Sequence, residues 1–213
     1  MSTTWDPAAY LAFDDHRSRP FRDLLVRIGA PDPRRVVDLG CGPGHLTPLL
    51  AQRWPRAQIA ALDSSAEMVT AARERGIAAD RMDVVDWMPG PTDDVVVTNA
   101  VLQWVSRHRE LIPRWLAALP AGAWFAMQVP ANFGAPSHTL LRELAAEPRW
   151  AEAITLPGAE TVAEPAGYAD LITATGAAVD AWETTYVQRL TGPDPVLAWL
   201  EGTALRPVRE VLD

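Results

Sequence analysis

Hydrophobic residues recur in two alternating patterns along the first 130 residues of the chain. Short apolar runs rich in β-branched residues are typical of buried strands, whereas apolar residues three and four positions apart are typical of helices. The short runs predict strands over residues 35–39, 57–62, 77–83, 94–99 and 123–129. The helical spacing predicts helices over residues 44–54, 66–75 and 107–118. Because strands and helices alternate, we expect βαβ units around a parallel sheet.

Local signals support the ends of these helices. Pro48 lies in the first turn of its helix, where a missing N–H costs least. The segment Ser64-Ser65-Ala66-Glu67 matches a capping box, and Gly76 ends the helix that this segment opens. Two more helical segments are expected within residues 5–30, ahead of the first strand.

The regular alternation ends at Pro130. The spacing beyond it predicts helices over residues 137–146, 165–175 and 194–204. Residues 178–190 alternate between apolar and polar side chains, which predicts a half-exposed strand.

Composition narrows the function. With 48% hydrophobic and 22% charged residues, the chain has an ordinary globular balance. It shows no membrane span and no secretory signal, so we expect a cytoplasmic protein. Cys41 is the single cysteine and the four histidines are scattered, so we expect no disulfide framework and no metal. The net charge of −8 argues against a nucleic-acid partner. Every basic residue is an arginine, which suits carboxylate binding.

The glycine turn after the first strand is the strongest motif. Gly40, Gly42 and Gly44 alternate, but the next residue is His45, so the G-x-G-x-x-G fingerprint fails. A P-loop also fails, because no G-K-[ST] follows. Asp38 precedes the turn, and its carboxylate would repel a pyrophosphate but attract an ammonium group. We therefore expect a ligand that carries an amino group.

Acidic residues stand at the ends of the next two expected strands. Asp63 lies about 20 residues past the turn, where a contact to ribose hydroxyls is expected. Asp83 could accept a hydrogen bond from an adenine amino group. Alternatively, such aspartates cap turns or helices. Together the three acids suggest sites for an amine, a ribose and a base.

This glycine motif, with its following acids, resembles the S-adenosylmethionine-dependent methyltransferases. The resemblance implies a Rossmann-like α/β fold, a mostly parallel sheet with helices on both faces. It implies S-adenosyl-L-methionine as cofactor and S-adenosyl-L-homocysteine as product. The implied cofactor-binding residues are Asp38, Gly40, Cys41, Gly42, Asp63, Ser64, Asp83, Val84, Asn99 and Ala100. It divides one domain, residues 1–213, into a helical cap over 1–30, a cofactor-binding core over 34–130, an insertion over the active site at 131–165 and a C-terminal part at 166–213.

A narrower resemblance, to the trans-aconitate 2-methyltransferases, spans almost the whole chain. It rests on Trp5-Asp6-Pro7, Arg17-Ser18-Arg19-Pro20, Asn99-Ala100-x-Leu102-Gln103-Trp104, Trp182-x-Thr184-Thr185-Tyr186 and Leu205-Arg206-Pro207. Chains of this family continue to a final antiparallel strand, which we expect this sequence to lack. The resemblance implies methyl transfer to a carboxylate of a small polycarboxylic acid, most simply trans-aconitate.

The substrate's negative charges need partners. The candidate substrate-binding residues are Arg17, Arg19, Gln103, Trp104, Asn132, Tyr186 and Arg206. Each arginine could equally be a solvated surface residue, and Trp104 a core residue. An ionised carboxylate attacking a sulfonium methyl needs no general base, so we expect no catalytic residue.

Other functions stay open at this point. A carboxyl methyltransferase acting on a carrier-bound acid, of the malonyl-carrier type, shares the Asn-Ala-x-Leu-Gln-Trp segment. A nicotinamide-dependent oxidoreductase and a silent S-adenosylmethionine-binding module are the alternatives from other classes. A nucleic-acid N-methyltransferase would carry [ND]-P-P-[YF], which Asn99-Ala100-Val101-Leu102 does not match. We expect a monomer with a small-molecule substrate.

Overall fold

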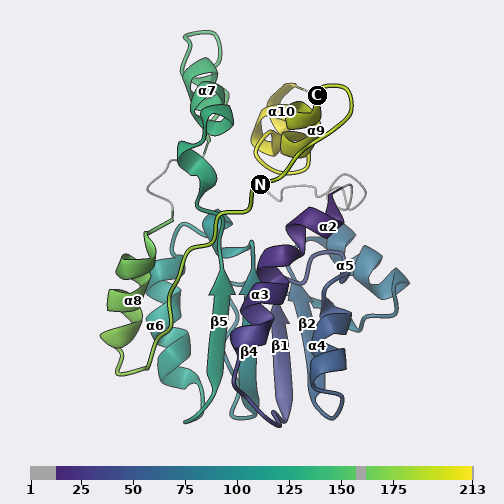
Figure 1. Cartoon of the computed structure of the whole chain (residues 1–213), viewed down its shortest axis with the longest axis vertical. Coiled ribbons are helices and arrows are strands. Elements are labelled where there is room, and N and C mark those ends of the chain that lie inside the picture. The colour runs from purple at the N-terminus through teal and green to yellow at the C-terminus, as the bar shows by residue number, and fades with distance from the viewer. Residues whose placement is uncertain (1–12, 157–161, 213) are drawn as a thin grey trace.

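A five-stranded parallel sheet forms the centre of the computed structural model, which describes residues 13–156 and 162–212 (Figure 1). Its strands are β1 (Arg35–Leu39), β2 (Gln58–Asp63), β3 (Ala79–Arg81), β4 (Asp93–Asn99) and β5 (Trp124–Gln128). The strand order is β3-β2-β1-β4-β5, and every pairing is parallel. The parallel sheet predicted from the alternating pattern is therefore confirmed, with a shorter third strand than expected.

Helices cover both faces of the sheet, because neighbouring valines of each buried strand point to opposite faces. On one face, Val36 and Val95 pack against helices α3 and α4. On the other, Val37 and Val96 pack against α6 and α8. The helices are α2 (Asp14–Arg17), α3 (Arg19–Arg27), α4 (Thr47–Arg53), α5 (Ala66–Glu74), α6 (His108–Ala118), α7 (Pro136–Ala145), α8 (Pro165–Thr173), α9 (Pro195–Glu201) and α10 (Arg206–Leu212), with short 3-10 turns η1 (Leu102–Trp104) and η2 (Asn132–Gly134). The Rossmann-like fold class is confirmed.

Two predicted helix starts are confirmed, but the cap of α5 is one residue later than the capping box from Ser64 to Glu67 implies. Ser65 is the N-cap of α5, and its side chain accepts a hydrogen bond from the Met68 N–H at 3.2 Å. Pro48 lies in the first turn of α4. The first expected helical segment falls mostly within residues 1–12, which lie outside the described residues.

The strand predicted over residues 178–190 is wrong, because the structure has no strand there. Alternation shows only that two sides of a segment meet different surroundings, whereas a strand also needs a neighbouring backbone to pair with. Side chains hold this segment instead. The Tyr186 hydroxyl donates to Asp23 of α3 at 2.5 Å, and the Arg27 guanidinium lies 4.9 Å from the centre of the Trp182 ring. Within the described residues, β5 therefore remains an edge of the sheet.

Helices α7, α9 and α10 lie beyond the carboxyl ends of the strands, whereas α8 packs beside α6 on a face of the sheet (Figure 1). Figure 1 shows α7 on one side of this end of the molecule and α9 and α10 on the other. Helix α10 was not predicted, although Leu205, Val208 and Leu212 have the three- and four-residue spacing of a helix. No helix in the described ranges is both long and apolar enough to cross a bilayer.

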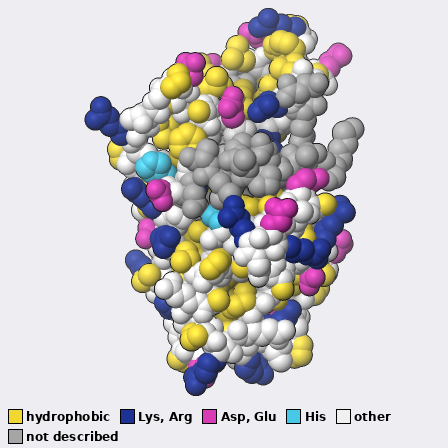
Figure 2. Space-filling model, turned by 90° about the vertical axis from the view of Figure 1, so that its right-hand side faces the viewer, with side chains coloured by type: hydrophobic (Ala, Val, Ile, Leu, Met, Phe, Trp, Pro, Cys, Tyr) yellow, Lys and Arg dark blue, Asp and Glu magenta, His cyan; other side chains and the backbone are white. Residues whose placement is uncertain are grey.

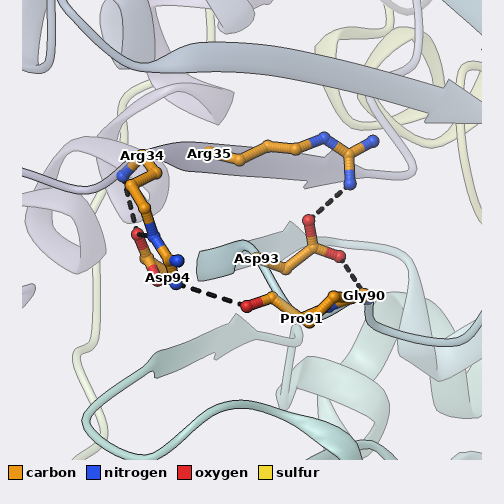
Figure 3. Close-up of polar contacts among 6 residues, drawn as sticks. All are labelled: Arg34, Arg35, Gly90, Pro91, Asp93 and Asp94. Carbon is orange, nitrogen blue, oxygen red and sulfur yellow. Dashed lines mark hydrogen bonds and ion pairs between the residues drawn. The ribbon is translucent and has the colours of Figure 1, made fainter.

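Two arginine–aspartate pairs join the amino-terminal ends of β1 and β4 (Figure 3). The glycine turn lies at the other, carboxyl-terminal end of β1. The register shifts between Arg35 and Val36, so that Asp93 and Asp94 both face arginines of the neighbouring strand. Asp93, with a side chain only 1% exposed, accepts from the Arg35 guanidinium and from the Gly90 N–H. Asp94 accepts three hydrogen bonds from Arg34, which lowers the pKa of Asp94.

Replacing Asp93 by alanine should lower the free energy of unfolding by about 2–3 kcal/mol, because it leaves the Gly90 N–H and the Arg35 guanidinium, both partly buried, without their partner. The more exposed Asp94→Ala should cost clearly less. Urea unfolding of both variants measures this, with Asp93→Asn as the isosteric control. Equal losses for the two alanine variants would show that burial does not set the strength of these pairs.

Candidate active site

The N–H groups of the glycine turn are all used within the protein. The N–H groups of Gly40 and Cys41 both donate to the Leu62 carbonyl, at 2.8 and 2.9 Å. The Gly42 N–H donates to an Asp63 carboxylate oxygen at 2.8 Å. A loop that holds a pyrophosphate instead points such N–H groups at its ligand. This pairing supports the exclusion of a pyrophosphate ligand that the sequence suggested.

Gly42 leaves room for a ligand to approach the turn. Its backbone is left-handed, with φ of +56°, and a Cβ placed on it would meet no atom within 4 Å. The side of the turn at Gly42 is therefore open, while Cys41 beside it is buried.

Asp38 lies under the turn and is 5% exposed. Its carboxylate accepts a hydrogen bond from the Thr47 hydroxyl at 2.6 Å. Burial raises the pKa of Asp38 to about 6, and the charge of Asp63 adds to this effect, while the Thr47 hydrogen bond opposes it. A ligand cation beside Asp38 would favour the ionised form, so this site suits an ammonium group.

Asp63 ends β2 next to the turn. Its second carboxylate oxygen accepts the Ser65 N–H at 2.9 Å, so this side chain orders both the glycine turn and the start of α5. Burial raises the pKa of Asp63, while its backbone hydrogen bonds lower it. Ser64 beside it is exposed. The ribose contact implied by the resemblance stays a prediction.

Asp83 does not end a strand, because β3 stops two residues earlier at Arg81. Its side chain is exposed and accepts a hydrogen bond from the Val85 N–H at 3.0 Å, which closes a turn. Val84 is buried in the core with Trp87. In the structure, Asp83 therefore caps a turn, which was the alternative to a ligand contact. Its contact to adenine stays a prediction.

The end of β4 carries unusual backbone and side-chain features. Ala100 has a φ of +56°, a conformation that alanine seldom adopts. Gln103 donates from Nε2 to the Ala100 carbonyl at 2.7 Å. The side-chain oxygens of Asn99 and Gln103 are buried and have no hydrogen-bond partner within the described part of the chain.

Two cavities meet at Asn99. A small cavity of about 20 Å³ lies beside the glycine turn, against Asp38, Gly40 and Gly42. A large cavity of about 1350 Å³ is lined by residues of α3, β5, α7 and α8 and by residues 177–190. The small cavity has room for only about one water. A nucleoside cofactor would therefore lie over the open side of Gly42, with its reactive end at the boundary that Asn99 shares.

The structure brings together most, but not all, of the predicted substrate residues. Those that line the large cavity are Arg17, Gln103, Trp104, Asn132 and Tyr186. Arg19 is exposed and does not line it. Arg206 is buried outside this cavity. The pKa of Glu67 is lowered mainly by its hydrogen bond with Ser65, and the charge of Arg206 lowers it a little further. Sequence order therefore did not show which arginines face the cavity.

Arg17 and Tyr186 are held by partners across the fold. The Arg17 guanidinium donates to the Trp199 carbonyl of α9 at 2.8 Å and lies 4.9 Å from the Trp199 ring centre. The Tyr186 hydroxyl donates to Asp23, and burial, with the nearby Asp23 carboxylate, raises the pKa of Tyr186 to about 12.

Sequence reasoning missed several basic residues of the large cavity, namely His16, Arg27, His138 and Arg142. His138 and Arg142 lie four residues apart on one face of α7, and both line the cavity. Burial lowers the pKa of His138, and the charge of Arg142 lowers it further. Their spacing was visible in the sequence, but the direction in which α7 faces was not.

The surface shows mixed charge. Figure 2 shows arginine side chains scattered among acidic ones on the face that it presents, rather than a continuous basic surface. Among the described residues, no three His, Cys, Asp or Glu side chains lie where they could hold a metal ion.

Comparison with known proteins assigns the class. Residues 13–162 match a family model described as a methyltransferase domain. The chain belongs to the S-adenosylmethionine-dependent methyltransferases. It is 61% identical over 211 residues to a trans-aconitate 2-methyltransferase of Rhodococcus jostii (strain RHA1). The matched region covers 98% of this chain and 83% of that protein. It is 54% identical to the protein of the same name from Mycobacterium tuberculosis (strain ATCC 25177 / H37Ra), over 98% of this chain and 81% of that protein.

Solved structures share the fold. A SAM dependent methyltransferase from Aquifex aeolicus matches with a TM-score of 0.57 at 17% identity, over 81% of this chain and 89% of that one. Phosphoethanolamine N-methyltransferase 2 of Haemonchus contortus, solved with S-adenosyl-L-methionine, matches with a TM-score of 0.60 at 17% identity, over 80% and 40% of the two chains. The oxidoreductase and carrier-bound-acid alternatives receive no support from these comparisons.

Proposed function

We propose that this methyltransferase esterifies a carboxylate of a small polycarboxylic acid, and that trans-aconitate is its substrate. The observation that carries the proposal is the identity of 54–61% with proteins named trans-aconitate 2-methyltransferase. The identity extends over 98% of the chain, so it includes the elements that line the large cavity as well as the glycine turn.

The chemistry places few demands on the side chains. S-adenosyl-L-methionine supplies a methyl group bonded to a positively charged sulfur. The carboxylates of a polycarboxylic acid are ionised near neutral pH and are therefore already nucleophiles. The protein has to align the carboxylate with the methyl group and exclude water. Asp38 would hold the cofactor's ammonium group, and the substrate would enter from the large cavity.

Basic side chains on the cavity wall would hold the carboxylates that do not react. Arg17 and Arg142 both line the large cavity, one from the N-terminal helices and one from α7. Their charges approach the cavity from separate elements, which suits an acid with several carboxylates. Arginine can bind each carboxylate through two parallel hydrogen bonds.

Replacing Arg17 or Arg142 by alanine should raise the KM for trans-aconitate at least about tenfold, since each loses a charge-assisted hydrogen bond. The affinity for S-adenosyl-L-homocysteine should stay close to wild type. Arg19→Ala is the matched control, because Arg19 lies beside Arg17 in sequence but outside the cavity. Steady-state kinetics with mass spectrometry of the methyl ester measures both steps.

Two results would contradict the proposal. If no ester forms from trans-aconitate while another di- or tricarboxylate is methylated, the substrate is wrong. If both arginine variants keep the wild-type KM, the cavity is not where the acid binds. The monomeric state also stays a proposal, which sedimentation velocity would test.

A further inference from the structure

One face of α7 forms part of the wall of the large cavity. His138, Leu141 and Arg142 line this cavity, and they lie three and four residues apart, so they share one face of the helix. Leu140 and Leu144 do not line the cavity, and both are more than half exposed. The two basic side chains of α7, His138 and Arg142, are therefore neighbours on the face that meets the cavity.

The basic side chains of α7 have no acidic partner among the described residues. The described acidic residues of the cavity wall lie on α3 and on residues 177–190, and they are Asp23, Asp180 and Glu183. Arg27 holds one of them, since it pairs with Asp180 at 3.3 Å. Arg142, in contrast, has no ion pair or side-chain hydrogen bond within residues 13–156 and 162–212. The wall at α7 therefore carries a positive charge without a counter-ion, which suits an anionic ligand.

Uncharged groups surround the His138 imidazole at close range. Its Nδ1 lies 3.3 Å from the Ser137 hydroxyl oxygen, and its ring meets the Phe133 ring edge-on, with the ring centres 5.9 Å apart. Helix α7 packs mainly against η2, which carries no charged side chain. Besides Arg142, the charged residue of α7 is Glu143, which is exposed.

The charged and titratable groups that meet the cavity from α2 are His16 and Arg17, which bring no negative charge. Burial and the charge of Arg142 hold the pKa of His138 below its ordinary value. The imidazole is therefore neutral near pH 7 in the ligand-free protein.

A bound carboxylate would reverse this balance at His138. A carboxylate only accepts hydrogen bonds, and a protonated imidazole offers two N–H donors where a neutral one offers a single donor. A negative charge nearby also raises the pKa of a histidine. The bound acid would stay ionised, while the unprotonated ring nitrogen would gain a proton from solvent.

We propose that His138 takes up one proton from solvent when the polycarboxylate binds, so that an imidazolium and a guanidinium on one face of α7 hold a carboxylate that does not react. This rests on the proposed function, because that function places the acid in the large cavity. His138 then determines specificity, since the acid needs a second carboxylate for α7 in addition to the one that receives the methyl group.

Calorimetry of trans-aconitate binding to the protein saturated with S-adenosyl-L-homocysteine tests the proposal. Saturation removes the titration of Asp38 from the measurement, because the ligand's ammonium group keeps that carboxylate ionised. Titrations at about pH 7 in buffers with different heats of ionisation count the protons. The wild type should take up about one proton and His138→Gln none, because an amide side chain does not titrate.

The affinity should depend on pH with a defined sign. The complex holds the His138 proton more tightly than the free protein does, so wild-type affinity should fall by up to about tenfold per pH unit as the pH rises above about 6. The affinity of His138→Gln should change less than about twofold over the same range. In the wild type, the imidazole Cε1–H signal that is lost in His138→Gln should shift to the protonated position when the acid is added.

His16→Gln is the matched control, since His16 is another histidine of the cavity wall, and it should keep the wild-type proton uptake. Circular dichroism checks folding, and His138→Asn replaces His138→Gln if that variant does not fold. Binding of trans-aconitate without proton uptake, equal uptake in the folded His138 variant, or loss of uptake in His16→Gln would overturn the proposal.

Fumarate, a dicarboxylate, separates this proposal from the identity of the substrate. If trans-aconitate does not bind but fumarate binds with a proton uptake that His138→Gln abolishes, the role of His138 stands and the proposed substrate is wrong. If neither acid binds, both proposals are refuted.

Discussion

Replacing Asp38 by asparagine should weaken S-adenosyl-L-methionine binding about 100-fold, because the variant loses a buried charge opposite the ligand's ammonium group. The same replacement should make the ligand-free protein more stable. Both effects follow from one observation, the burial of an ionisable carboxyl that is 5% exposed. The buried carboxylate of Asp38 thus lowers the stability of the ligand-free protein and favours binding of a cation.

The pH dependence has a defined sign. Burial raises the pKa of Asp38 to about 6, so the folded state holds this proton more tightly than the unfolded state does. The free energy of unfolding therefore falls as the pH rises from about 4 to 6, and the cost is fully present above pH 6. A pKa raised this far corresponds to a cost of about 3 kcal/mol. The Asp38→Asn variant would carry no such cost, and the wild type would lose ligand affinity as the pH falls below about 6.

Calorimetry between pH 5 and pH 8, with thermal unfolding of the ligand-free protein between pH 4 and pH 8, measures these effects. Asp170→Asn is the matched control, because Asp170 of α8 is exposed and lines neither cavity. The role of Asp38 is refuted if Asp38→Asn keeps wild-type affinity, or if its affinity still changes with pH as that of the wild type does.

Replacing Gly40 by alanine should lower the free energy of unfolding by about 3–5 kcal/mol, through steric overlap and left-handed strain together. Gly40 has a φ of +83°, and a Cβ there would lie 2.2 Å from the Cγ2 atom of Val101. Val101 is β-branched and packs against the core formed with α6 and α8, so it cannot easily move aside. Gly42→Ala should cost only about 1 kcal/mol, because its left-handed backbone opens onto free space.

A double-mutant cycle separates the two causes. Gly40→Ala combined with Val101→Ala should recover the steric part of the loss but not the backbone strain, so the two changes should not add. Urea unfolding of the four proteins in the cycle measures the coupling. If Gly40→Ala costs no more than Gly42→Ala, the contact with Val101 does not constrain the turn.

The prediction of the sheet succeeded because its signals are local. Each strand has a short run such as Val36-Val37, and each crossover helix has its own apolar spacing. The Ser65 cap and Pro48 act within one turn of their own helices. The prediction failed at residues 178–190, where a strand depends on a partner backbone that local alternation does not reveal.

The candidate site was predicted in part. The glycine turn and Asp38 are contiguous in sequence, so their relation is visible before folding. Arg17, Arg19 and Arg142 carry the same charge, and nothing in the sequence says that only Arg17 and Arg142 line the cavity. Packing of α2 and α7 decides this. Which buried oxygens lack a hydrogen-bond partner within the described residues likewise becomes visible only when distant segments have been placed.

Sequence by itself determined the fold class, the presence of the glycine turn and the family, since these depend on periodicity and on a contiguous motif. Tertiary structure alone decided which basic residues meet at one cavity and how the turn uses its own N–H groups. The physical reason is that hydrogen-bond satisfaction and burial are properties of neighbours distant in sequence, whereas helix and strand preferences belong to each segment.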